Sequence, residues 1–214
     1  MVTLLLVCAV AYLLGSVNTS ILISHFYGTD IRNHGSGNAG ATNTLRTLGK
    51  KAAVMVVLGD AFKGVLAVVI GGFLVKLSAN LGASVYQNME LYRCAAGFFA
   101  ILGHNFPVYF KFRGGKGILT SAAVVAALEP VIFFCLIGLF LVLVIATKYV
   151  SLGSVCAALG LMILPAVILG SDHLPFIIFG VCDGALAIFM HRGNIVRLLQ
   201  GKESKLGEKK KKTE

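Results

Sequence analysis

The chain has 214 residues, of which 57% are hydrophobic and only 13% are charged, whereas a soluble domain carries about 25% charged residues. Its 25 glycines exceed ordinary usage, and glycine lets transmembrane helices approach one another closely. This composition excludes an ordinary soluble domain. The net charge of +10 does not indicate a nucleic-acid partner, because the basic run Lys209–Lys212 lies in a terminal tail.

Several hydrophobic blocks follow one another along the chain. A transmembrane helix needs roughly 20 apolar residues, or about 17 at the short end, so most blocks fit one crossing. The first block has no basic start and no convincing cleavage site for a signal peptide, and we interpret it as a retained span. The blocks lie at about residues 2–24, 52–75, 92–110, 118–147, 150–170 and 174–190.

The block at 118–147 is too long for one upright helix and is interrupted by Glu129-Pro130. Proline breaks a helix interior and a buried glutamate is costly, so the block is either one tilted span or a helical hairpin. The hairpin brings four groups of basic residues to one side, which the positive-inside rule makes the cytosol. These groups lie at 25–51, at 111–116, at Lys148 and after His191.

We therefore predict an all-α integral membrane protein of seven transmembrane helices, with an external N-terminus and a cytosolic C-terminus. No polar linker separates two hydrophobic blocks, so residues 1–200 are expected to form a single domain. Residues 201–214 are expected to form a basic, disordered cytosolic tail. The arm at 118–128 is short for a full crossing.

The first cytosolic loop is rich in glycine, hydroxyls and amides. It reads Gly-Ser-Gly-Asn-Ala-Gly-Ala-Thr-Asn over residues 35–43 and is followed by Arg46. Glycines allow backbone N–H groups to turn inward as an anion nest, and an arginine fork matches phosphate. A flexible polar linker would account for the glycines but not for this combination, so we predict an anion site here.

The second loop reads Gly-His-Asn-Phe-Pro at 103–107 and Phe-Lys-Phe-Arg-Gly-Gly-Lys-Gly at 110–117. Backbone N–H groups, a helix N-terminus and lysine are the elements of a phosphate-binding loop. A Walker A motif is absent, which argues against a nucleotide hydrolase. A basic cluster that serves membrane topology alone is the competing interpretation.

Two further polar segments follow, at 148–154 and 191–197. Lys148 and Ser151 could be a snorkelling lysine and a helix cap, whereas His191 and Asn194 share one helical face. Within the blocks themselves, Asp60 and Lys63 can pair at i, i+3 and Asp183 has no partner near it in the sequence. Charges inside a membrane are expensive, so each of these three is a candidate functional residue.

Four motifs in this order resemble those of the bacterial acyl-phosphate-dependent glycerol-3-phosphate acyltransferases, the PlsY family, over nearly the whole chain. Arg113 and Met190 depart from the lysine and the arginine that the family usually has. The motifs are G-S-G-N-x-G-A-T-N-x-x-R at 35–46, G-H-x-x-P ending in G-G-K-G at 103–117, K-Y-x-S-L-x-S at 148–154 and H-x-x-N-I-x-R-L-x-x-G-x-E at 191–203.

The resemblance implies a seven-helix enzyme of the bacterial cytoplasmic membrane, with its active site facing the cytosol. The reaction it implies transfers a fatty acyl group from acyl phosphate to the sn-1 hydroxyl of glycerol 3-phosphate, giving lysophosphatidic acid and inorganic phosphate. Membrane lipid is the surrounding partner, and the enzyme that produces acyl phosphate is a candidate protein partner.

On this basis we assign His191, Asn194 and Ser36 to the reacting centre. His191 is the candidate general base, and the substrate's own phosphate is the competing proton acceptor. The expected substrate-binding residues are Asn38, Thr42, Asn43, Arg46, His104, Lys111, Gly114, Gly115, Lys116, Gly117 and Ser151.

Two other classes of function fit the sequence less well. A small-anion transporter accounts for the hydrophobicity but not for the gathering of every polar motif on one side. A lipid phosphotransferase would need acidic magnesium ligands, and the cytosolic loops hold only Asp30. The five cysteines stand singly, at spacings that suit neither a disulfide framework nor a zinc site, so we expect no metal and no cofactor.

Overall fold

The computed structural model describes residues 1–80 and 89–207, and every regular element within them is helical. The prediction of an all-α membrane protein is confirmed. The helices are α1 (Val2–Gly15), α2 (Thr19–Phe26), η1 (Ile31–Asn33), α3 (Ala41–Leu48), α4 (Lys50–Asn80), α5 (Met89–Asn105), η3 (Val108–Phe110), α6 (Ile118–Leu128), α7 (Pro130–Thr147), α8 (Val150–Ile168), η4 (Ser171–His173), α9 (Leu174–Met190) and α10 (Arg192–Leu199).

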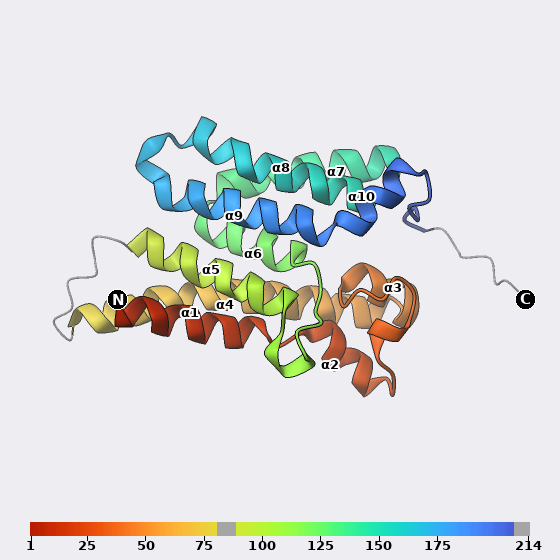
Figure 1. Ribbon diagram of the computed structural model, residues 1–214, viewed down its shortest axis with the longest axis horizontal. Coiled ribbons are helices and arrows are strands. Elements are labelled where there is room, and N and C mark those ends of the chain that lie inside the picture. Colours follow the sequence, from red (N-terminus) through yellow and green to blue (C-terminus); the bar gives the residue numbers. More distant parts are fainter. Residues whose placement is uncertain (81–88, 208–214) are drawn as a thin grey trace, which may run out of the picture.

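The long helices run back and forth along the longest axis of the molecule (Figure 1). Helices α1, α4 and α5 pack together as one group, and α6 to α9 form a second group that joins the first through α4–α6 and α5–α9 contacts. The short helices α2, α3 and α10 gather at the right-hand end of Figure 1. The four polar segments predicted from the sequence therefore meet at one end of the bundle.

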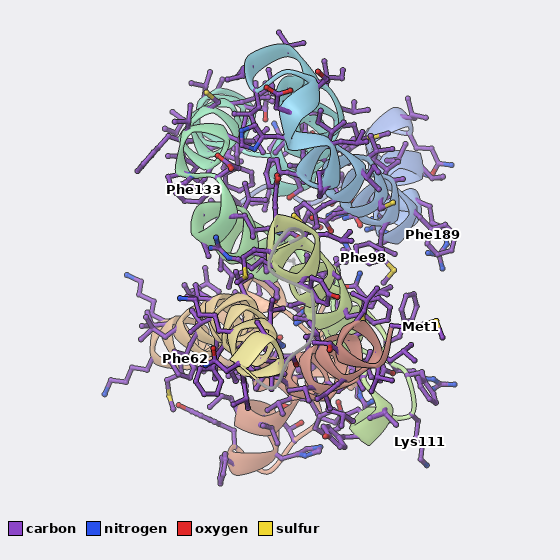
Figure 2. The ribbon with its side chains drawn as sticks, turned by 90° about the vertical axis from the view of Figure 1, so that its left-hand side faces the viewer. Met1, Phe62, Phe98, Lys111, Phe133 and Phe189 are labelled. Atoms are coloured by element: carbon purple, nitrogen blue, oxygen red, sulfur yellow. The ribbon has the colours of Figure 1, made fainter. Side chains whose placement is uncertain are left out.

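The outer surface of the bundle is apolar, as a lipid-facing surface must be. Figure 2 shows Phe62 and Phe189 on the outside of the bundle, and their side chains are 65% and 55% exposed. The core of the second group includes Val124, Ile132 and Phe176, each with 0% exposure. Large apolar side chains thus lie both inside the bundle and over much of its outer surface, which is expected of helices surrounded by lipid.

The break predicted at Glu129-Pro130 is confirmed. Helix α6 ends at Leu128, and Pro130 is the first residue of α7, a position where its missing N–H is tolerated. The two helices pack against each other, which rules out one continuous tilted helix over 118–147.

Five helical segments in the described part of the chain are long and apolar enough to cross a membrane. Helix α5 has 17 described residues, at the short end of what a crossing needs, and α6 has only 11, which falls short of a full-length span. The count of seven crossings and the orientation of the termini remain predictions.

The first hydrophobic block differs from an uninterrupted helix because the chain bends between α1 and α2. The Asn18 side chain caps α2 by accepting a hydrogen bond from Ile21 N at 3.1 Å, and the freed Val17 carbonyl accepts one from Lys63 Nζ at 2.9 Å. The bend turns α2 toward the end of the bundle where the polar segments gather.

Residues 201–207, the first half of the expected tail, fold back over the polar end of the bundle. Leu206 N donates to the Lys148 carbonyl at 2.7 Å, and an Arg46 guanidinium nitrogen donates to the Ser204 carbonyl at 3.4 Å. Sequence composition alone does not reveal these partners, which lie far away along the chain. Residues 208–214 of the expected tail lie outside the described residues.

Candidate active site

A cavity of about 1310 Å³ opens at the end where the four polar segments meet. It continues from there between the helices of the second group. Of the residues predicted from the sequence, the lining includes Ser36, Asn38, Thr42, Asn43, Arg46, His104, Lys116, Gly117, Ser151, His191 and Asn194. Lys111, Gly114 and Gly115 are not among the lining residues.

The first loop turns at its glycines and uses three of its own N–H groups internally. Ser36 N donates to Asn43 Oδ1 at 2.9 Å, Gly37 N to the His34 carbonyl at 2.9 Å and Gly40 N to the Asn38 carbonyl at 3.1 Å. Gly35 and Gly37 have positive φ angles of 60° and 72°, which residues with a side chain rarely adopt. Gly40 then begins α3, whose first N–H groups have no partner within the helix and carry the positive end of its dipole. Ser36 and Thr42 line the cavity beside these groups, so the loop presents donors to an anion.

Asn43 is built into this loop as its scaffold. Its amide nitrogen donates to the carbonyls of Ile31, His34 and Asn38 at 3.2, 2.9 and 3.1 Å, and its oxygen accepts from Ser36 N at 2.9 Å. The side chain is 1% exposed. These bonds occupy the amide donors of Asn43, so this side chain holds the loop in shape rather than donating to a ligand.

In the second loop, Gly114 and Gly115 lie behind the cavity wall rather than on it. Their N–H groups do not point at the cavity, because they donate to Asn105 and His104 carbonyls at 3.2 Å each. The last carbonyls of α5 need such partners. An added Cβ would lie 2.0 Å from the His104 carbonyl oxygen at Gly114, and 2.2 Å from His104 Nε2 at Gly115. Both glycines allow close packing.

The basic residues of this loop separate into inner and outer ones. Lys116 lines the cavity, whereas Lys111 is exposed, has a left-handed backbone and extends from the edge of the bundle in Figure 2. Arg113 is exposed as well. Of the three basic residues in this loop, only Lys116 therefore lines the cavity.

A polar network connects the second and fourth segments. Lys116 Nζ donates to Asn194 Oδ1, and Asn194 Nδ2 donates to Glu203 Oε1 at 2.6 Å. Arg197 Nε donates to the other carboxylate oxygen of Glu203 at 2.7 Å. Burial lowers the pKa of Lys116 to about 8, a shift that the nearby Glu203 carboxylate opposes.

Glu203 remains a carboxylate within this network. Partial burial raises its pKa, but the hydrogen bonds from Asn194 and Arg197 outweigh burial and lower the pKa overall. Two cations and one carboxylate leave the polar end with an excess of positive charge, which suits a phosphate.

His191 ends α9 and is 4% exposed. Its Nδ1 lies 2.8 Å from the Ala187 carbonyl oxygen, which can only accept, so Nδ1 carries the proton and Nε2 of the neutral ring is free to accept one. Burial lowers the pKa of His191 to about 4, and the Lys116 charge lowers it further. The ring is therefore neutral near pH 7, as a general base must be.

The opposite wall carries the ion pair predicted between Asp60 and Lys63, at 2.9 Å. His104 Nδ1 lies 2.9 Å from Lys63 Nζ and 3.6 Å from Asp60 Oδ1. These three residues connect α4, α5 and, through the Val17 carbonyl, the end of α1. The pair thus supports the site as well as the helix packing, since Asp60 and His104 both line the cavity.

The inner part of the cavity is apolar. Its walls come from α6, α7, α8 and α9, and they include Val125, Phe133, Leu136, Phe140 and Leu161. Such a chamber suits a hydrocarbon chain. Among the described residues, no group of three or more His, Cys, Asp or Glu side chains is placed to hold a metal ion.

Sequence reasoning did not assign Glu203 or Arg197 to the site, although both lie within the fourth motif. Glu203 could have been noticed in the sequence, because it is an isolated acidic residue between basic residues after the last hydrophobic block. The folded-back segment also brings Lys202, Ser204, Leu206 and Gly207 to the cavity wall.

Comparisons with known proteins agree on one family. The family described as Glycerol-3-phosphate acyltransferase matches residues 5–201. A glycerol-3-phosphate acyltransferase of Thermoanaerobacter pseudethanolicus is 45% identical over 205 residues, covering 95% of this chain and 96% of the relative. One from Clostridioides difficile is 41% identical over 211 residues, covering 96% and 97%.

Two crystal structures of PlsY (YgiH), an integral membrane glycerol 3-phosphate acyltransferase, share the fold. The glycerol 3-phosphate form has a TM-score of 0.82 and 34% identity, covering 95% of this chain and 96% of the other. The lysophosphatidic acid form has a TM-score of 0.80 and 33% identity, covering 95% of each chain. The chain therefore belongs to the PlsY family of integral membrane glycerol-3-phosphate acyltransferases.

Proposed function

We propose that this enzyme transfers a fatty acyl group from acyl phosphate to the sn-1 hydroxyl of glycerol 3-phosphate in bacterial phospholipid synthesis. The products are lysophosphatidic acid and inorganic phosphate. The observation that carries the proposal is the single cavity with a cationic end and an apolar chamber. Acyl phosphate has both characters in one molecule, and glycerol 3-phosphate brings a second phosphate to the cationic end.

The cationic end has enough separate donors for two phosphates. Lys116 and Arg197 belong to the network around Glu203, whereas Arg46 and the first N–H groups of α3 lie on a separate helix. We assign the N-terminus of α3, with Ser36, Asn38 and Thr42, to the acyl phosphate. Lys116, Arg46 and Ser151 are assigned to glycerol 3-phosphate.

The chemical step is a substitution at the acyl carbon. The sn-1 oxygen forms a bond to this carbon, the bond from the carbon to the phosphate oxygen breaks, and phosphate leaves with the electron pair. His191 Nε2 accepts the hydroxyl proton, with Asn194 beside it at the reacting centre. Acyl phosphate is already activated, so positioning and charge neutralisation supply most of the acceleration.

We also propose that the polar end of the bundle faces the cytosol of a bacterial cell, with seven crossings and an external N-terminus. The positive-inside distribution of lysine and arginine supports this orientation. A fluorescent protein fused to the C-terminus should fluoresce in intact cells, and a periplasmic reporter at the same place should stay inactive. The opposite pattern would reject the orientation.

The function is tested with the purified full-length protein in lipid nanodiscs. Palmitoyl phosphate and glycerol 3-phosphate should give lysophosphatidic acid and released phosphate in equal amounts. Palmitoyl-CoA and palmitoyl acyl-carrier protein are the comparison donors and should give little product. Product from a thioester but none from palmitoyl phosphate would reject the proposed donor, and a product acylated at the sn-2 hydroxyl would reject the proposed position.

A further inference from the structure

A buried carboxyl group lies partway along the apolar chamber, and the proposed acyl transfer does not use it. Asp183 lines the cavity from the middle of α9 and is 1% exposed. Its Oδ1 accepts a hydrogen bond from Ser121 Oγ of α6 at 3.1 Å. Its Oδ2 is buried and has no hydrogen-bond partner among the described residues.

The position of Asp183 along the chamber follows from the helix. Asp183, Ala187 and His191 are spaced at i, i+4 and i+8, so they lie on one face, and all three line the cavity. Eight residues at 1.5 Å each place Asp183 about 12 Å from His191 along the helix axis. Leu161 is ten residues beyond Ser151 on α8, at about 15 Å by the same measure, so the apolar wall continues past the carboxyl group.

A hydrocarbon chain with its head at His191 would pass this carboxyl group. A buried polar group without a partner is costly, and a saturated chain offers it none. Ser121 satisfies only one of the two oxygens. The end torsion of an aspartate side chain is broad and roughly two-fold, so the carboxyl group can turn within its place in the cavity wall.

The hydroxyl of Ser154 shows that a polar group in this chamber can have a hydrogen-bond partner within the protein. Ser154 also lines the cavity, but its Oγ donates to the Val150 carbonyl of its own helix at 3.0 Å. Asp183 therefore differs from its polar neighbour in having an oxygen to offer. A hydroxyl on the bound chain fits that oxygen in either protonation state, because it can both donate and accept.

We propose that Asp183, held by Ser121, is a specificity residue for acyl chains that carry a hydroxyl group near mid-chain. This inference rests on the proposed function, since the chamber holds the acyl group of the donor. With carbon–carbon bonds of about 1.5 Å in a zigzag chain, a depth of about 12 Å corresponds to roughly the tenth carbon. A hydroxyl near the carboxyl head or near the methyl end would miss Asp183.

The test compares matched acyl phosphates on the full-length enzyme in nanodiscs. The donors are octadecanoyl phosphate and its 3-hydroxy, 10-hydroxy and 16-hydroxy forms, and the readout is kcat/KM. The ratio of the 10-hydroxy to the unsubstituted donor should be about tenfold higher in wild type than in Asp183→Leu, the value of one net hydrogen bond. The 3-hydroxy and 16-hydroxy ratios should be the same in both proteins.

Three controls separate specificity from folding. Asp183→Asn keeps a hydrogen-bonding group and should retain the preference, whereas Ser154→Ala removes a hydroxyl already bonded to its own helix and should leave the ratio unchanged. The melting temperature of each variant reports how much the bond between Ser121 of α6 and Asp183 of α9 stabilises the fold. The ratio of two donors is measured on one protein, so it does not depend on that stability. An equal ratio in wild type and Asp183→Leu would overturn the proposal.

Failure of the proposed function would look different. Wild type would then release no phosphate from octadecanoyl phosphate itself. The 10-hydroxy and unsubstituted octadecanoyl chains would then be compared as CoA and acyl-carrier-protein thioesters. If the ratio of their kcat/KM values did not depend on Asp183, the specificity role alone would be overturned.

Discussion

The Lys116 ammonium donates a hydrogen bond to the Asn194 side-chain oxygen, across 78 positions of the sequence. This bond fixes the Asn194 amide, because its nitrogen must then face the Glu203 carboxylate. A loop before α6, a turn after α9 and the folded-back segment become one unit around the free Nε2 of His191.

Lys116 should set the alkaline limit of the reaction. Burial lowers its pKa to about 8, and the charged form is the one that attracts phosphate. The charge is therefore lost as pH rises through about 8, and kcat/KM for glycerol 3-phosphate should fall there, since this constant reports the free enzyme. Lys116→Arg should move the fall to higher pH because arginine keeps its proton. An unchanged fall in Lys116→Arg would assign it to another group.

His191→Ala should lower kcat by about 10²- to 10⁴-fold if Nε2 accepts the proton. His191→Gln can imitate the hydrogen bond to Ala187 but cannot accept the proton, so it should be impaired to a similar degree. The measurement is a pH–rate profile of each variant beside wild type and Asn194→Ala. A loss of only a few tenfold with the pH dependence unchanged would favour the substrate phosphate as proton acceptor, leaving His191 to orient the hydroxyl.

Gly115→Ala should destabilise the protein by about 1–3 kcal/mol through overpacking. The new methyl group would lie 2.2 Å from His104 Nε2 and 2.4 Å from the Ala39 carbonyl oxygen. Moving the loop away would also displace Lys116, so KM for glycerol 3-phosphate should rise. Gly138→Ala is the control, because nothing lies within 4 Å of its added Cβ. Equal melting temperatures for the two variants would contradict the close packing.

Glu203→Gln should lower kcat/KM by roughly tenfold, since a neutral amide holds Arg197 and Asn194 less strongly than a carboxylate does. Glu90→Gln, in the first turn of α5 at the other end of the bundle, should have no effect on activity. If both variants kept full activity, the folded-back segment would be dispensable for the reaction.

Much of the fold could be predicted because membrane helices follow local rules. The Glu129-Pro130 turn was predictable because proline lacks the N–H that a helix interior needs, and the one-sided gathering of the polar motifs followed from it. The bend at Asn18 was not, since it depends on Lys63 of α4 reaching the Val17 carbonyl.

The site shows the same division. The types of residue in the 35–46 and 191–203 segments were enough to predict an anion site, because glycine, hydroxyl, amide and guanidinium groups have few other uses together at a membrane surface. The direction of each donor was not predictable. The N–H groups of Gly114 and Gly115 turn to α5 because its last carbonyls need partners, and Lys111 lies outside the cavity.

Composition, charge and helix breakers act within a few residues, so the sequence alone predicts a helical membrane protein, its family resemblance and the gathering of the polar motifs at one end. Which polar atoms meet depends on how helices distant in the chain pack together. Arg46 reaches Ser204 across 158 positions and Ser121 reaches Asp183 across 62. Such pairs form because helices pack at fixed distances, and a buried polar group takes the partner that packing brings to it.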